Sequence, residues 1–185
     1  MNKNIRVTLL TAIALLIFFL TWIVTLYGTA GLVSIFGIHN IYALAFFVAA
    51  IASATIVTSA SYYAFVIALT TNADVNIYLL SVIMGAGMTV GDIFFFSIGK
   101  ETRTVLPKGI KKNIDKIAEW LVGKKNHHLS IITFLWAGFM PLPNDVITVS
   151  TGIASANWKY VIPSIFLGNI VFIYLFAYVL VPYFF

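Results

Sequence analysis

The chain has 185 residues, of which 61% are hydrophobic and 9% are charged, and its mean hydropathy is +1.01. These values exclude an ordinary soluble domain and are typical of an all-α membrane protein with several spans. The chain contains no cysteine, which excludes disulfides and thiol chemistry, and its three histidines are too scattered to hold a metal ion. We therefore expect neither a metal nor a cofactor.

The net charge of +5 is concentrated in one segment. Eight of the eleven basic residues lie between Lys100 and Lys125. By the positive-inside rule, such a cluster beside membrane spans lies in the cytoplasm, where it can also contact anionic lipid head groups. Nucleic acid is not an expected partner, because no polar domain is present to bind it.

The first predicted element is a membrane span within residues 1–28, ahead of a single membrane domain over residues 29–185. Its apolar core is about twenty residues long, against roughly 7–15 residues for the core of a secretory signal. We therefore interpret it as an uncleaved span.

The next apolar stretch, residues 41–70, is interrupted by small polar residues between Ser53 and Ser61. If it crossed the membrane once, from a cytoplasmic N-terminus, the basic segment would lie outside the cell and violate the strongest charge signal in the chain. A re-entrant hairpin, which enters and leaves on the same side, removes this conflict. Placing the N-terminus outside the cell would also remove it, against the weaker signal of Lys3 and Arg6.

A span is predicted over residues 77–99, followed by an amphipathic helix over residues 109–122. Apolar residues recur at helical spacing on one face of this helix, and lysines occupy the other (Ile110, Ile114, Ile117 and Leu121; Lys111, Lys112 and Lys116). Such a helix lies either in the head-group layer or against the cytoplasmic side of the protein itself.

Residues 129–156 are apolar except for a central segment that reads Pro141-Leu-Pro143-Asn144-Asp145. Proline lacks a backbone donor and clashes with the preceding turn of a helix. In hydrocarbon, non-helical backbone persists only when it is buried in protein or lines a wet cavity. The segment therefore predicts a second re-entrant hairpin, with two half-helices that meet at a polar elbow. A last span is predicted over residues 160–181.

Each predicted hairpin is followed by a short polar turn and a span. The basic segment between the two units makes the second unit enter the membrane from the opposite face. This pattern is typical of the inverted repeats of secondary transporters, whose binding site lies between the two hairpin tips.

Asp92 is the first candidate site residue. It lies about eight residues inside the cytoplasmic end of its span, roughly 12 Å deep. A carboxylate there costs about 2.5–3.5 kcal/mol on insertion scales, so it should face the interior and have a partner or a proton. Gly85, Gly87 and Gly91 would let another helix approach closely. The alternative is that Asp92 binds a neighbouring backbone group and only holds the bundle together.

Asp145 is the second candidate. Following Pro143 and Asn144, it falls in the first turn of a half-helix, where a carboxylate meets the positive end of the helix dipole. Asp145 therefore either lines a transport pathway or simply caps its helix. We expect Pro141, Pro143 and Gly152 to shape the hairpin.

Lys159 and Asn169 belong to the last span. Lys159 lies between two aromatic residues at the start of the span, which is typical of an interfacial anchor, and binding of an anionic head group is the alternative. Asn169 either supplies neutral hydrogen bonds to a pathway, as Asn144 would, or joins helices to each other.

An enzyme is not expected. Intramembrane aspartyl proteases carry Gly-x-Gly-Asp, and the corresponding residues here are Thr89-Val90-Gly91-Asp92. A lipid phosphotransferase would need a dense run of Asp and Arg, and the chain has two arginines.

The chain resembles the DedA superfamily, the VTT-domain or SNARE-associated-type membrane proteins, over roughly residues 40–180. The resemblance is carried by four groups of residues in a fixed order (Gly85, Gly87, Gly91 and Asp92; Ile98-Gly99-Lys100; Pro141 to Asp145 with Gly152; Tyr160 to Asn169). It implies two opposed re-entrant hairpins and movement of lipids, such as phospholipids or polyprenyl phosphates, across the bilayer. The chain departs from the family pattern in having Gly138 and Asn144 where many members have arginines, so Asp145 and Lys159 are the charged residues near the second elbow.

We therefore expect three full spans, two re-entrant hairpins and a cytoplasmic amphipathic helix, in a multi-pass protein of a prokaryotic cell membrane. The expected function is translocation of an amphipathic lipid, with Asp92, Asp145, Asn144, Asn169 and Lys159 along the pathway. The expected partners are membrane lipids, including an anionic lipid or a lipid phosphate, and association between copies of the chain is left open. The alternatives are a proton- or ion-coupled transporter of a small solute and a non-transporting assembly factor.

Overall fold

The computed structural model describes residues 40–51, 59–70, 75–105, 126–140 and 144–181, with six isolated positions before residue 40. Most of the predicted first span, the predicted amphipathic helix 109–122, and Pro141 and Pro143 lie outside the described residues. Within these residues the secondary structure is helical and contains no strand, which confirms the all-α class.

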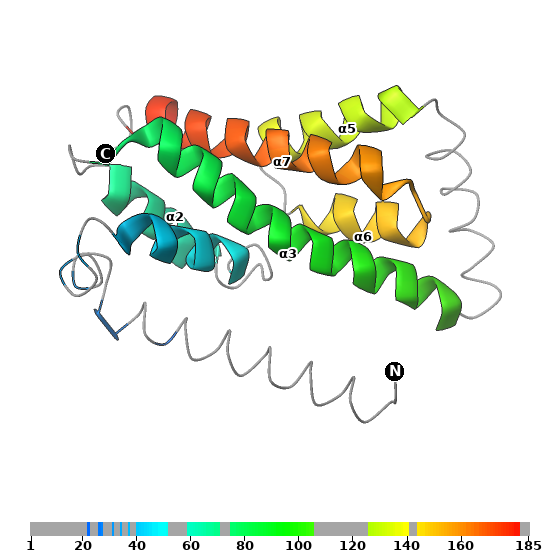
Figure 1. The fold of residues 1–185 in the computed structure, drawn as a ribbon, viewed down its shortest axis with the longest axis horizontal. Coiled ribbons are helices and arrows are strands. Elements are labelled where there is room, and N and C mark those ends of the chain that lie inside the picture. The colour runs from blue at the N-terminus through cyan, green and yellow to red at the C-terminus, as the bar shows by residue number, and fades with distance from the viewer. Residues whose placement is uncertain are drawn as a thin grey trace.

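The described helices are shown in chain order in Figure 1. They are an unlabelled helix Asn40–Ile51, α2 Ser59–Thr70, α3 Ile77–Val105, α5 Asn126–Phe139, α6 Asp145–Ile153 and α7 Trp158–Leu175, which continues as a π-helix, η2 Phe176–Leu180. Two helical stretches, Ile77–Thr102 and Trp158–Val179, are long and apolar enough to cross a membrane, and both coincide with predicted spans.

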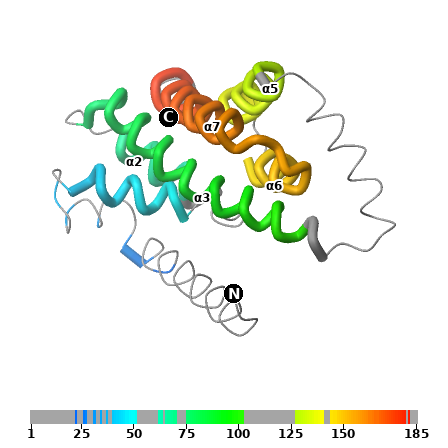
Figure 2. The backbone as a smooth tube through the Cα atoms, turned by 45° about the vertical axis from the view of Figure 1, so that its right-hand side comes forward, coloured from blue at the N-terminus to red at the C-terminus, as the bar shows by residue number. Residues whose placement is uncertain are grey.

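α3 runs between the first helices and the group formed by α5, α6 and α7 (Figure 2). It has 29 residues and contains no proline. The side-chain oxygen of Asn76 accepts a hydrogen bond from the backbone N–H of Leu79 (3.1 Å), which caps the start of the helix. The backbone N–H of Asn76 donates to the hydroxyl oxygen of Tyr42 (3.0 Å), so α3 begins tied to the helix Asn40–Ile51.

The shorter helices pack around the long helices α3 and α7 (Figure 1). The helix Asn40–Ile51 shares a buried cluster with α2, whereas α5 packs against α7 and α6 packs against α3. α5 ends at Phe139 and α6 begins at Asp145, so the helix is interrupted where the Pro-Leu-Pro segment predicts an interruption.

Glycines bring the backbones of these helices into direct contact with α3. A Cβ atom added to Gly87 would collide with the carbonyl oxygen of Phe46, and one added to Gly99 would collide with that of Val149. In the same contact between α3 and α6, Gly152 of α6 lies against the carbonyl oxygen of Phe96. The helix Asn40–Ile51 and α6 therefore pack on α3 at glycine positions, where the backbones come into direct contact.

α7 joins the two halves of the molecule. The side chain of Asn157 caps its start by accepting a hydrogen bond from the backbone N–H of Lys159 (3.1 Å). Farther along, Gly168 lies against Ala137 and the backbone of α5, and Ile170 lies against Gly85 of α3. α7 is thereby held between α5 and α3.

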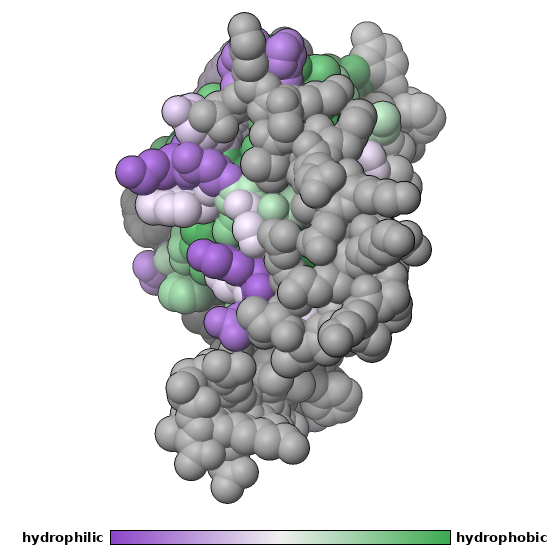
Figure 3. All heavy atoms as spheres, turned by 90° about the vertical axis from the view of Figure 1, so that its right-hand side faces the viewer, coloured by the Kyte–Doolittle hydropathy of each residue, from purple (hydrophilic) through white to green (hydrophobic). Residues whose placement is uncertain are grey.

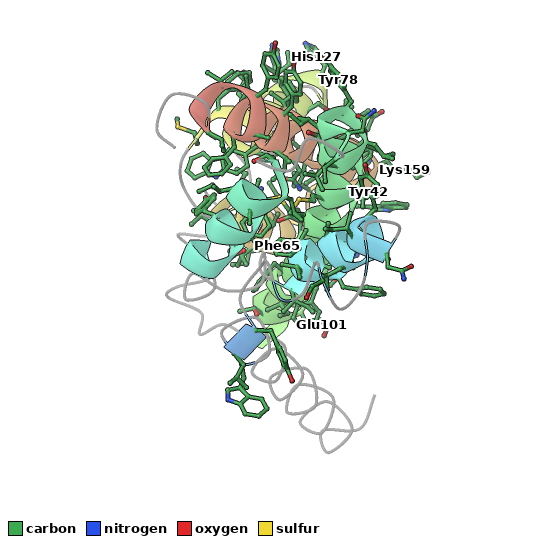
Figure 4. The ribbon with its side chains drawn as sticks, turned by 90° about the vertical axis from the view of Figure 1, so that its left-hand side faces the viewer. Tyr42, Phe65, Tyr78, Glu101, His127 and Lys159 are labelled. Atoms are coloured by element: carbon green, nitrogen blue, oxygen red, sulfur yellow. The ribbon has the colours of Figure 1, made fainter. Side chains whose placement is uncertain are left out.

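The buried apolar side chains form two clusters at successive levels of the bundle. The first is built from the helix Asn40–Ile51, α2 and the first half of α3, and includes Met88, Ile173 and the fully buried Phe65, which is labelled in Figure 4. The second contains Phe96, Ile165, and apolar residues of α5 and of the turn that follows α6. Between these levels, α3 and α7 each carry polar side chains.

Apolar side chains also cover much of the outside. On α3, four exposed apolar residues form a stripe along one face of the helix. Their exposed fractions are 67% for Tyr78, 45% for Val82, 50% for Val90 and 44% for Ile93. Hydrophilic side chains gather instead at the end of the molecule that faces the viewer in Figure 3. The exposed polar residues at the end of α3 and the beginnings of α5 and α7 are Lys100, Glu101, His127, His128, Asn157 and Lys159.

Candidate functional site

A buried network of polar side chains lies where α3, α7 and the start of α6 meet. At its centre the amide nitrogen Nδ2 of Asn169 donates to Asp92 Oδ2 over 2.8 Å. Both residues have exposed fractions of 0%. The same nitrogen donates to Thr89 Oγ1 over 3.2 Å. Asn169 therefore uses its two N–H groups on two acceptors of α3.

The spacing along α3 places both acceptors on one face. Thr89 and Asp92 are three residues apart, so their side chains are neighbours on a helix. The Thr89 hydroxyl donates to the carbonyl oxygen of Gly85 (2.7 Å) and therefore faces Asn169 with its lone pairs. Residues Ser81, Gly85 and Asp92, which the sequence places on one face, are all buried.

Asn144 extends the network to the start of α6. Its Nδ2 donates to Asn169 Oδ1 over 2.6 Å. Asn144 occupies the N-cap position of α6, and asparagine at that position usually accepts a hydrogen bond from the first turn. Here its side chain makes no such bond. The amide is directed to α7, so the tertiary contact replaces the local cap.

Asp145 stands next to Asn144 in the first turn of α6 and is half-buried. Its Oδ1 atom is buried and has no hydrogen-bond partner among the described residues. The Oδ1 atom of Asp92 is likewise buried and has no hydrogen-bond partner among the described residues. Within the described residues, the network thus has two acceptor atoms that lack donors, one on α3 and one in the first turn of α6.

The surroundings of Asp92 contain little that offsets a negative charge. In the described part of the chain, its hydrogen-bond partner is a neutral amide. Lys100 lies eight residues farther along α3, which is about 12 Å along the helix axis. Burying a carboxylate without a cationic partner costs free energy. The buried position of Asp92 therefore lowers the stability of the folded protein, and the rest of the fold has to compensate for it.

The predicted glycines explain how the network can form. Gly85 lies against Ile170, one residue from Asn169, so α7 approaches α3 closely beside Thr89. Gly87 lies against the helix Asn40–Ile51, and Gly152 lies against the backbone of α3. Gly91 is also buried. A larger side chain at Gly85 or Gly152 would move α7 or α6 away from Asp92.

Of the predicted pathway residues, Asp92, Asn144 and Asn169 are joined by hydrogen bonds, and Asp145 is adjacent to them. Lys159 is exposed at the start of α7, ten residues from Asn169, or about 15 Å along the axis. Figure 4 labels it at the edge of the molecule. Thr89 was not predicted as a site residue, although its position three residues before Asp92 was a usable signal.

The arrangement can bind a polar group, but the described residues contain no group of three or more side chains suited to a metal ion. Searches with family models, curated proteins and solved structures find no match to this chain. The resemblance to the DedA superfamily therefore stays a prediction.

Proposed function

We propose that this protein moves an amphipathic lipid across a bilayer, with the polar head group passing the network of Asp92, Asn169 and Asn144. The observation that carries the proposal is the position of this network. Two fully buried polar side chains, the carboxylate of Asp92 and the amide of Asn169, lie near the middle of two membrane-length helices, and Asn169 is bonded to Asn144 at the start of α6. Polar residues at such a depth are costly and are typical of substrate pathways.

Membrane integration is supported by the ends of α3 and α7. The rings of Tyr78 and Tyr174 stack with centroids 5.5 Å apart, and Tyr174 stacks on Tyr178 at 5.4 Å. From Tyr78 to Lys100 the helix rises about 33 Å, which matches a hydrocarbon core of roughly 30 Å. An aromatic belt at one end and a lysine at the other suit the two membrane interfaces.

The hydroxyl groups support the same conclusion. Ser81, Thr89, Thr133 and Thr151 are buried, and each donates to the backbone carbonyl four residues earlier. Serine and threonine in membrane helices satisfy themselves in this way where water is absent.

The lengths of the shorter helices favour re-entrant hairpins. α2, α5 and α6 have 12, 14 and 9 residues, which corresponds to about 18, 21 and 14 Å. None of these rises covers a hydrocarbon core of about 30 Å. The helix Asn40–Ile51 with α2, and α5 with α6, would therefore each enter and leave the membrane on one side, and these two opposed units would form the inverted repeat.

In this arrangement the Lys100 end of α3, followed by the basic segment up to Lys125, faces the cytoplasm. The head group would enter beside Lys159 and Asp145, pass Asp92 and Asn169, and leave on the Tyr78 side. The acyl chains would remain in the lipid beside the exposed stripe of α3.

Flux measurements in proteoliposomes test this proposal. Phospholipids and a polyprenyl phosphate, each with a fluorescent acyl or prenyl chain, are compared for the native protein, Asp92→Asn and Asp145→Asn. Exposed Glu101, which lies at the end of α3, provides the matched control Glu101→Gln. We expect flux with the native protein and the control, and at least a tenfold loss in the two site variants.

The alternatives give different results. Flux of a small solute that requires a proton gradient, without lipid flux, would establish a coupled solute transporter. Destabilisation by Asp92→Asn with no flux of lipid or solute by the native protein would establish an assembly factor. Either result would overturn lipid translocation.

A further inference from the structure

We propose that the head group bound by this network is a primary ammonium, so that the protein selects amine-headed lipids over phosphate-only or quaternary head groups. This inference rests on the proposed function and names its substrate class. It follows from the hydrogen-bond inventory of the network.

The donors of the network are already in use. Asn169 donates to Asp92 and Thr89, and the Thr89 hydroxyl donates to the Gly85 carbonyl. Asn144 donates to the carbonyl oxygen of Asn169, so that this oxygen is also occupied. Because a carboxylate can only accept, Asp92 fixes the orientation of the Asn169 amide, and this orientation in turn fixes Asn144.

The unmet capacity is on the acceptor side. Asp92 Oδ1 and Asp145 Oδ1 are both buried and lack a donor within the described residues. Asp92 is fully buried, so water does not supply one at the surface. A ligand that completes this network must bring N–H or O–H groups, and a positive charge would offset the carboxylates.

A primary ammonium meets both requirements, because it carries three N–H donors and one positive charge. A quaternary ammonium carries the charge without a donor. A phosphate brings only acceptors and negative charge to a place that already has both. The described lysines do not change this balance, because Lys100 and Lys159 lie about 12 and 15 Å along their helices from Asp92 and Asn169.

A bound metal ion fits the network less well. Mg²⁺ takes six oxygen ligands and Ca²⁺ takes six to eight. The described side chains offer two carboxylate oxygens without partners. An ammonium does not need such a shell, because each of the two free carboxylate oxygens can accept one of its N–H groups.

The two carboxylates differ in burial, and this difference sets the order in which a ligand would meet them. Asp145 is half-buried and would meet the ammonium first, and Asp92 is reached only when the tip of α6 moves away from α7. The bond between Asn144 and Asn169 holds this tip in place. Its opening would connect the two carboxylates along one path.

The test uses a series of lipids that differ only in N–H count. Acyl-labelled phosphatidylethanolamine, its N-methyl and N,N-dimethyl derivatives and phosphatidylcholine have three, two, one and no N–H groups at constant charge. Phosphatidylglycerol serves as the anionic lipid. We expect the flux to fall along this series by roughly tenfold or more in total, and phosphatidylglycerol to be slow. Asp92→Asn should flatten the series, and Glu101→Gln should preserve it.

A binding measurement separates a lipid amine from a free amine and covers the case without flux. Thermal stability of the detergent-purified protein is measured with ethanolamine, choline or inorganic phosphate, and uptake of labelled ethanolamine into proteoliposomes is followed. Stabilisation by ethanolamine that is lost in Asp92→Asn supports the ammonium site, and uptake would identify a free amine as its ligand.

The outcomes are distinguishable. Equal flux for all lipids, or faster flux of phosphatidylglycerol, would overturn the ammonium site while lipid translocation stands. Absence of flux for every lipid would overturn lipid translocation, and absence of stabilisation by ethanolamine would then overturn the ammonium site as well.

Discussion

Asn169 donates to Asp92 over 2.8 Å and joins two helices across 77 residues of sequence. Both partners are fully buried, and neither has a cationic neighbour among the hydrogen-bond partners described. The bond lies between the two apolar clusters, and its strength depends on the low polarity around it. It therefore ties α3 to α7 and fixes the orientation of the polar groups around it.

Replacing Asn169 by leucine should destabilise the protein strongly. The change leaves Asp92 and the Asn144 amide without their partner, at about 1–3 kcal/mol for each orphaned group. We expect a clear drop in the midpoint of thermal unfolding in detergent. Asn157→Ala is the control, because it removes an exposed helix cap at about 1 kcal/mol. Equal losses in the two variants would show that the network contributes nothing beyond an ordinary cap.

Gly152→Ala should separate α6 from α3. The added Cβ would collide with the carbonyl oxygen of Phe96, whereas the Cβ of Gly138→Ala would lie 3.4 Å from the nearest atom, which is ordinary contact. We expect Gly152→Ala to lower the unfolding midpoint and the flux, and Gly138→Ala to change both only slightly. The measurements are the thermal unfolding and the lipid flux of the two variants. A Gly152→Ala protein as stable as Gly138→Ala would mean that α6 does not pack as described.

Val90→Lys should prevent stable membrane integration. Val90 is half exposed near the middle of α3, and a lysine at mid-bilayer costs about 2.5–3.5 kcal/mol on insertion scales. On the surface of a soluble helix the same change would stay within about 0.5 kcal/mol. Ser97→Lys is the control, since Ser97 is exposed and lies near Lys100, where a lysine reaches the head groups. The amount of protein in the membrane fraction is the measurement, and equal amounts for both variants would argue against a lipid-facing stripe.

Single cysteines should report the two sides of the membrane. The chain has no cysteine, so Asn76→Cys and Asn157→Cys each introduce a unique thiol. Both positions are exposed helix caps, which makes the variants a matched pair. With a membrane-impermeant maleimide, we expect Asn76→Cys to react on intact cells and Asn157→Cys to react only after permeabilisation. Reaction of both on intact cells would place them on one side and exclude the second hairpin as re-entrant.

The sequence by itself determined the helical class, two long apolar helices and the interruption at the Pro-Leu-Pro segment. These features depend on local chemistry, namely apolar runs of sufficient length and the missing backbone donor of proline. It also singled out Asp92, Asn144, Asp145 and Asn169, because polar residues are conspicuous in apolar stretches. The predictions for residues 109–122 and for most of the first span concern residues that the structure does not describe.

Only the tertiary structure decided which of these residues belong together. No local rule connects Asn169 with Asp92, and the usual rule for an N-cap asparagine would have assigned Asn144 to its own helix. The connection depends on glycines that let α7 and α6 approach α3, so that partners far apart in the sequence come within hydrogen-bond distance. Lys159 shows the reverse, because its place on α7 keeps it at the exposed end, apart from the network. Burial then gives the network its character, since an acceptor that water cannot reach has to find its donor within the protein or in a ligand.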